Sequence, residues 1–119
     1  MYYCIVVQLS EGLIMADREL LLSLLINLET ELREIGLWDA HSPPTSAFES
    51  QLPFFYDTMN FGQWLQWVFV ARFRAILDGE HPLPPSCDVA PMAEEYFKEL
   101  DVYSDPIVGL LRRFDEEFK

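Results

Sequence analysis

The apolar residues between Asp17 and Ile35 recur at alternating spacings of four and three, which is the seam of an amphipathic helix packed in a bundle. The seam consists of Leu21, Leu25, Leu28, Leu32 and Ile35. Asp17 is suited to cap the amino end of this helix, and Gly36 is suited to the position just after its carboxyl end. The pattern therefore predicts a first helix over residues 17–35, and further leucines cover more than one face of its first half.

A second helix is predicted to start at Asn60, because Asn60 and Gln63 have the spacing of a capping box. Gly79 marks its expected end. Its expected core face combines aromatic and aliphatic residues: Phe61, Trp64, Leu65, Val68, Phe69, Phe73, Ile76 and Leu77. Trp67 and Val70 are expected to lie off that face. Residues 37–59 show no long period, so they predict a long connector with one short turn of helix, and long connectors are often functional.

Two shorter helices are predicted toward the carboxyl end, each with a proline in its first turn. Pro91 opens one, and Pro106 opens the other after Ser104 or Asp105 as the cap. Their apolar stripes are Met92, Ala93, Tyr96, Phe97 and Leu100, and then Ile107, Leu110, Leu111, Phe114 and Phe118. Only residues 2–7 have the composition of a strand, and a strand without a partner is unstable in water. The chain is therefore predicted to be an all-α four-helix bundle with a long connector between its first two helices.

The amino-terminal residues 1–14 precede the first cap and add nothing to the helical period. We expect residues 1–14 to be an extension and residues 15–119 to be a single bundle domain that begins at Met15. Deleting the extension is expected to leave the melting temperature nearly unchanged. No Lys or Arg precedes Arg18, so this apolar start lacks the positive region of a secretory signal. Cys4 and Cys87 are expected to be free thiols in a reducing cytoplasm.

The net charge of the chain limits the classes of partner that it can bind. Its 119 residues include 20 Asp and Glu against 8 Lys and Arg, a formal net charge of −12, and half of the residues are apolar. This composition predicts one domain with a real core and an acidic surface. Because nucleic-acid binding is mostly neutralisation of phosphates by Lys and Arg, we expect neither nucleic acid nor an anionic membrane as a direct partner.

Residues that usually carry catalysis or hold metals do not cluster in this sequence. His41 and His81 are the only histidines, and the five glycines are too isolated to form a phosphate-binding loop. We therefore expect no catalytic residue, no metal and no cofactor. Asp57 is the exception, since it lies among aromatic residues. It acts either as a general acid in an apolar pocket or as a cap or brace at the start of the second helix.

The densest signal is the aromatic run over residues 53–67. Its members either fill the bundle interior or form an exposed apolar patch for a partner, since Trp and Tyr dominate interface hot spots. The candidate partner-binding residues are Pro53, Phe54, Phe55, Asp57, Trp64, Gln66 and Trp67.

At these residues the chain resembles the YqcC-like family of small bacterial proteins. The resemblance is carried by Ser50, Pro53-Phe54-Phe55, Asp57-Thr58-Met59, Trp64-Leu65-Gln66-Trp67, Pro82-Leu83-Pro84 and Val89-Ala90-Pro91. It covers the chain from Met15 onward, and Ala71 stands where the family often has a kinking proline. The resemblance implies a closed four-helix bundle of uncharacterised function. It also implies an association with tRNA pseudouridine synthase C, beside which members are commonly encoded and of which they have been suggested as a small subunit.

Three functions remain open at this stage, and the oligomeric state is open as well. The first is a non-catalytic module that docks on a basic partner protein such as tRNA pseudouridine synthase C, because an acidic surface complements a basic one. The second is a small hydrolase or isomerase that uses Asp57 as an acid or base. The third is a small-ligand binder, which requires a cavity in the bundle core.

Overall fold

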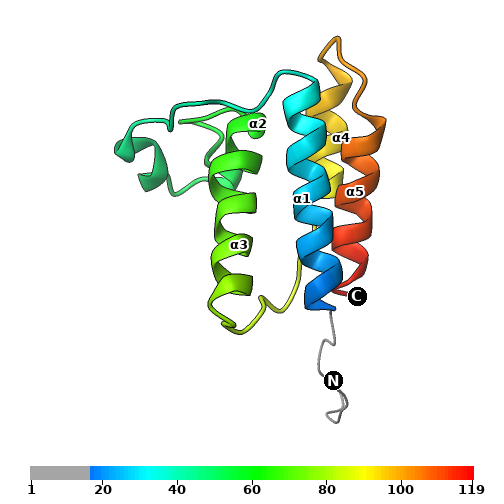
Figure 1. Ribbon diagram of the computed structural model, residues 1–119. Coiled ribbons are helices and arrows are strands. Elements are labelled where there is room, and N and C mark those ends of the chain that lie inside the picture. Colours follow the sequence, from blue (N-terminus) through cyan, green and yellow to red (C-terminus); the bar gives the residue numbers. More distant parts are fainter. Residues whose placement is uncertain (1–16) are drawn as a thin grey trace.

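The computed structural model describes residues 17–119, and they form four helices. These are α1 (Arg18–Glu34), a long second helix, α4 (Ala90–Lys98) and α5 (Asp105–Glu116) (Figure 1). The described residues contain no strand, which confirms the predicted all-α class. The expected extension and the strand-like residues 2–7 lie outside the described residues. Within the described part of the chain, no helix has the length and apolarity needed to cross a bilayer.

The second helix runs without a break from Phe61 to Asp78 in three parts. It begins as α2 (Phe61–Trp64), continues as the π-helical segment η3 (Leu65–Val70) and ends as α3 (Ala71–Asp78). Ala71, which stands where the family often has a proline, therefore lies inside a continuous helix.

The helix ends follow the predicted capping residues. The Asp17 side chain accepts hydrogen bonds from two backbone N–H groups of the first turn of α1, at 3.0 and 3.2 Å. Gly36 follows this helix with φ +78°, a conformation that glycine adopts readily. Asn60 and Gln63 form the reciprocal capping box, with bonds of 2.8 and 3.0 Å. These local signals explain why the helix boundaries were predictable.

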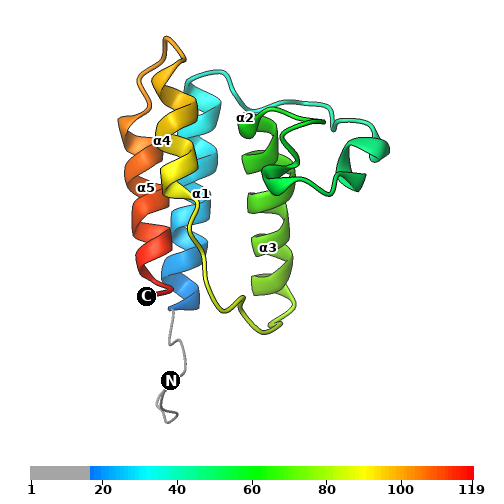
Figure 2. The same cartoon turned by 180° about the vertical axis from the view of Figure 1, so that it is seen from behind.

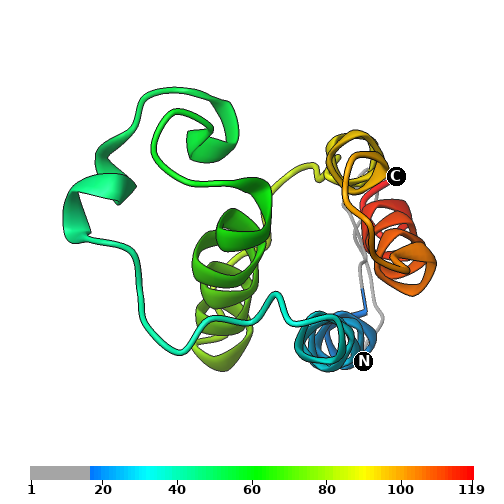
Figure 3. The ribbon, with the colours of Figure 1, turned by 90° about the horizontal axis from the view of Figure 1, so that it is seen from above.

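The core lies between α1, α5 and the second helix. α1 packs against α5 on one side and against η3 and α3 on the other, while α4 packs against α5 (Figures 1 and 3). The predicted seam of α1 is buried except for Ile35, which is half-buried. Leu24 is buried beside this seam and Leu20 packs against the core, whereas Ile26 is 47% exposed, so the predicted cover around the first half of α1 is only partial.

Seen from above, the ribbon of the second helix is well separated from the ribbons of α4 and α5 (Figure 3). Aromatic side chains fill the space between them. The ring of Phe114 lies 5.0 Å from Phe69 and 4.8 Å from Phe73, measured between centroids. Phe61 reaches Tyr96 of α4 at 5.6 Å. Aromatic pairs of this kind stabilise a fold by about 0.5–1.5 kcal/mol each beyond the area they bury.

Val70 corrects one sequence prediction. It was expected to lie off the core face, but only 4% of its surface is exposed. Val70 belongs to the π-helical segment, whose turn is wider than that of an α-helix. The wider turn changes the angle between successive side chains, so a strict period of 3.6 residues places Val70 on the wrong side.

The connector between α1 and the second helix contains two short 3₁₀ turns, η1 (Thr45–Glu49) and η2 (Pro53–Phe55), where one turn was predicted. It projects from the outer side of the second helix, away from α1, α4 and α5 (Figures 1 and 3). Ala47 and Met59 are buried against Val68. This small second core fixes the connector to the helix.

The segment that returns from α3 to α4 crosses the bundle (Figure 2) and is fixed by α5. Asp115 of α5 is 3% exposed, and its carboxylate accepts hydrogen bonds from the Val89 N–H (2.9 and 3.0 Å), the Ala90 N–H (2.8 Å) and the Cys87 thiol (3.1 Å). Asp115 therefore caps the amino end of α4 from another helix. Adjacent acids in a chain this rich in carboxylates usually lie on solvated helix faces, and Asp115 departs from that expectation.

Candidate interaction surface and groove

The connector carries a strained turn over Pro53–Tyr56, which we call the aromatic turn. Phe54 and Phe55 both have positive φ, at 55° and 50°. Residues other than glycine rarely adopt this region, and each costs about 1–2 kcal/mol there. Such strain persists only where the surroundings fix it, and it is concentrated at functional sites.

The packing of Phe54 and Phe55 on the second helix explains how the aromatic turn is held. The ring of Phe54 lies edge-on to Trp64 at 4.8 Å and to Phe61 at 5.7 Å, and Trp64 stacks on Phe61. The guanidinium of Arg72 lies 5.7 Å from the ring centroid of Phe55. Both strained residues are therefore held against the helix, and the turn is fixed in one conformation.

The outer side of the aromatic turn is exposed. Tyr56 is 65% exposed and Leu52, which precedes the turn, is 39% exposed; Pro53 is exposed as well. The turn thus presents apolar surface to solvent while Phe54 and Phe55 anchor it from behind. Exposed apolar side chains on a rigid support are the usual form of an interaction site.

Asp57 follows the aromatic turn and is exposed. Its carboxylate accepts a hydrogen bond from the Ser50 hydroxyl. Asn60, and not Asp57, caps the second helix. Asp57 therefore braces the connector from an exposed position, which differs from the enclosed apolar setting that the acid–base hypothesis requires.

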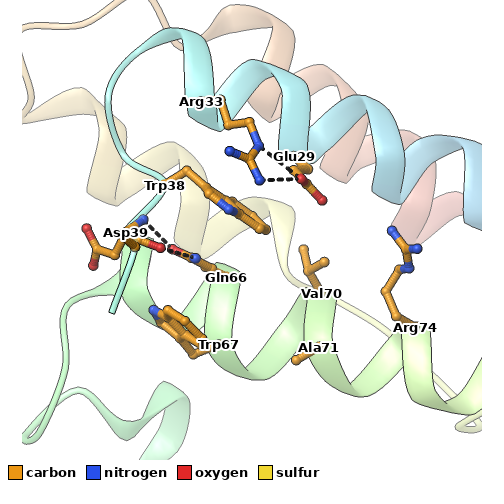
Figure 4. Close-up of a pocket in the computed structure, with 10 residues that line it drawn as sticks. Glu29, Arg33, Trp38, Asp39, Gln66, Trp67, Val70, Ala71 and Arg74 are labelled. Carbon is orange, nitrogen blue, oxygen red and sulfur yellow. Dashed lines mark hydrogen bonds and ion pairs between the residues drawn. The ribbon is translucent and has the colours of Figure 1, made fainter. Parts of the chain in front are cut away.

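A groove of about 540 Å³ lies between α1, the start of the connector and the second helix (Figure 4). We call it the tryptophan groove, because Trp38 of the connector and Trp67 of η3 line one end of it. Val70 and Ala71 also line it, and Arg74 lies at the other end (Figure 4).

Gln66 holds the connector to the tryptophan groove. It is 5% exposed, its amide oxygen accepts the Asp39 N–H at 2.7 Å, and its amide nitrogen donates to the Asp39 carbonyl at 2.8 Å. The side chain thus pairs with one residue's backbone as a neighbouring strand would. This pairing fixes Trp38, the preceding residue, at the mouth of the groove.

Of the two arginines that line the tryptophan groove, only one forms an ion pair with a described residue. Arg33 pairs with Glu29 at 2.8 Å, and its guanidinium lies 5.1 Å from the centroid of the Trp38 ring. Arg74 forms no ion pair with any described residue. The indole N–H of Trp67 is buried and has no hydrogen-bond partner within residues 17–119.

The structure divides the seven predicted partner-binding residues between two places. Pro53, Phe54, Phe55, Asp57 and Trp64 lie in or beside the aromatic turn, whereas Gln66 and Trp67 line the tryptophan groove. Trp64 and Phe54 face each other and are half-buried, so they support the turn. The predictions missed Trp38, which lies in a segment without a period. The only sequence feature that singled out Trp38 was its position two residues after Gly36, which marks the predicted end of the first helix.

No metal site is found in the described part of the chain: no group of three or more His, Cys, Asp or Glu side chains is placed to hold an ion. His41 and His81 are both exposed.

Comparison with known proteins identifies relatives over most of the chain. A family model, DUF446, described as tRNA pseudouridine synthase C, matches residues 20–117. An uncharacterized protein of Haemophilus influenzae is 37% identical over 86 residues, which cover 70% of this chain and 81% of that protein. The protein YqcC of Escherichia coli is 45% identical over 67 residues, covering 56% of this chain and 62% of YqcC.

Two further matches concern a larger protein and a solved structure. A tRNA pseudouridine synthase C of Pectobacterium carotovorum is 47% identical over 62 residues, which cover 52% of this chain and 16% of the synthase. The solution NMR structure of YqcC from E. coli superposes with a TM-score of 0.72 at 34% identity, covering 87% of this chain and 89% of YqcC. The fold is therefore shared with a solved relative.

Proposed function

This chain belongs to the DUF446 family, and from that membership we propose that it is a cytoplasmic, non-catalytic interaction module that docks on a tRNA pseudouridine synthase. The match to a segment of the Pectobacterium carotovorum synthase supports this proposal. Two domains in one polypeptide stay at high effective concentration. Where they are separate chains, the same contact must be made by affinity between exposed surfaces.

The observation that carries the proposal is the aromatic turn. Its exposed Tyr56 and Leu52 stand on a backbone that the packing of Phe54 against Trp64 holds in a strained conformation. A surface fixed before binding loses little entropy when a partner docks, and exposed tyrosines are frequent hot spots. The turn is therefore the surface that we assign to the partner.

The charge of the module favours a basic partner. The chain carries a net charge of −12, and the described residues form three ion pairs, all at the surface. An enzyme that binds tRNA needs a basic surface to neutralise phosphates. An acidic module is attracted to such a surface, and the attraction weakens as salt is added.

The test is a binding titration between this protein and the purified tRNA pseudouridine synthase C of the same bacterium. Tyr56→Ala is expected to weaken binding about tenfold or more, as loss of a hot spot does. Tyr103→Ala is the matched control, because Tyr103 is 72% exposed but lies between α4 and α5, and it is expected to leave the affinity unchanged. No association at low salt, or equal effects of the two variants, would contradict the proposal.

A further inference from the structure

The tryptophan groove has the dimensions and lining of a small-molecule site, separate from the aromatic turn. Its volume of about 540 Å³ lies within the range of about 300–1,000 Å³ that is typical of ligand pockets. Two indole rings, Val70 and Ala71 provide apolar walls, on which a flat ring can pack.

The charges beside the groove leave one cation available to a ligand. Glu29 is occupied by Arg33, with bonds of 2.8 and 2.9 Å. The carboxylate of Asp39 points away from the centre of the groove (Figure 4). Arg74 lines the opposite end and forms no ion pair with a described residue. The groove therefore offers an unneutralised guanidinium, even though the whole chain is acidic.

The uncharged polar groups beside the groove add little to the choice of ligand. The Gln66 amide pairs with the Asp39 backbone through its oxygen and one of its N–H groups. The Trp67 N–H has no hydrogen-bond partner in the described residues, but it is buried and therefore closed to a ligand in the groove. The distant acids of the chain are screened beyond about 8 Å at physiological salt, so the nearby guanidinium of Arg74 decides the preference.

We propose that the tryptophan groove binds a small aromatic carboxylate. The ring of the ligand packs against the apolar wall of the groove beside Trp38 and Trp67, and its carboxylate accepts charge-assisted hydrogen bonds from the guanidinium of Arg74. This site is independent of the proposed docking on the synthase, because it uses a different part of the surface.

Three probes that share one ring and differ in charge test the proposal: indole-3-propionate, indole-3-propionamide and tryptamine. Each is titrated into the isolated protein while the backbone, indole and arginine N–H signals are followed by NMR. The propionate is expected to produce saturable shifts at Trp38, Trp67 and Arg74. It is expected to bind about tenfold more tightly than the amide, which lacks the charge, and tryptamine is expected to bind most weakly.

Two variants place the binding in the groove. Arg74→Gln is expected to reduce the affinity for the propionate to that for the amide. Arg113→Gln removes an exposed arginine of α5 outside the groove and is expected to change nothing. Ala71→Glu, at an exposed helical position, adds a carboxylate three residues before Arg74 and is expected to abolish binding at an unchanged melting temperature.

The proposal is overturned by any of three results: no saturable shift, equal affinity for the three probes, or a preference for the propionate that survives Arg74→Gln. The probes are added to the protein alone, so none of these results bears on the synthase. Conversely, a failure to bind the synthase leaves the probe titration unaffected.

Discussion

At the residue scale, the Asp115 side chain stabilises the amino end of α4. It accepts two backbone N–H groups and one thiol while almost fully buried. Asp115→Ala leaves the N–H groups of Val89 and Ala90 without an acceptor. We expect the free energy of unfolding to fall by roughly 2–3 kcal/mol, the range for loss of a helix cap that is also a charged acceptor.

Chemical denaturation followed by circular dichroism measures this loss. Glu116→Ala is the control, because Glu116 is the neighbouring acid on α5 and is exposed. Its removal is expected to change stability by less than about 0.5 kcal/mol. If both variants lose the same stability, Asp115 does not act as the cap.

Cys87 provides a second prediction at this scale. Burial, then the hydrogen bond and charge of Asp115, and then the charge of Asp88 raise the pKa of the Cys87 thiol well above its ordinary value of 9.0. Above that ordinary value, the unfolded chain loses the thiol proton while the folded chain keeps it. Stability is therefore expected to fall as the pH rises past 9.0, and Cys87→Ser is expected to remove this part of the fall.

Thiol alkylation in a Cys4→Ser background checks the same shift. The wild-type Cys87 is expected to react slowly up to about pH 9, since the thiolate is the reactive form. Asp115→Asn is expected to speed the reaction, because it removes a negative charge beside the sulfur. Rapid alkylation of Cys87 near neutral pH would be incompatible with the raised pKa.

At the element scale, the pairing of Gln66 with Asp39 joins the connector to the second helix. Gln66→Leu keeps a similar size but leaves the Asp39 N–H and carbonyl without partners. The free energy of unfolding is expected to fall by about 1–3 kcal/mol. Hydrogen exchange is the more specific measurement, because the Asp39 amide is expected to exchange faster while the amides of α5 are unchanged at low denaturant.

Gln51→Leu is the control for this change, since Gln51 is an exposed connector residue. It is expected to leave both stability and exchange at Asp39 as they are. An unchanged exchange rate at Asp39 in Gln66→Leu would show that the connector is held by other contacts, such as the packing of Ala47 and Met59 on Val68.

Helices with local signals were predictable, and contacts between distant segments were not. Asp17, Asn60 and Pro91 each mark a helix start through bonds or dihedral angles confined to one turn. The π-helical segment η3 has no such signal. The pairing of Gln66 with Asp39 spans 27 residues, so it follows from the packed fold and not from local spacing.

The candidate site was predicted in part for the same reason. Aromatic density pointed to residues 53–67, and the aromatic turn lies there. The tryptophan groove depends on Arg33 of α1, Trp38 of the connector and Arg74 of α3, which meet only after folding. No spacing in the sequence relates these three residues.

At the scale of the whole molecule, the acid excess predicts two opposite responses to salt. Of the few ion pairs in the described chain, Arg33–Glu29 and Lys98–Glu95 lie within single helices, and Arg112–Glu94 joins α4 to α5. The described residues carry many more acids than these ion pairs neutralise, and the unpaired acids repel one another across the surface. Raising NaCl from about 10 mM to about 300 mM screens this repulsion and is expected to raise the melting temperature.

Association with a basic partner is expected to respond in the other direction, because the same ions screen the attraction between the two surfaces. Thermal unfolding of the protein alone and titration with the synthase, run over one salt series, separate the two effects. Binding that holds constant or strengthens with salt would mean that the acidic surface does not steer the contact. The apolar contacts of Tyr56 and Leu52 would then provide most of the binding free energy.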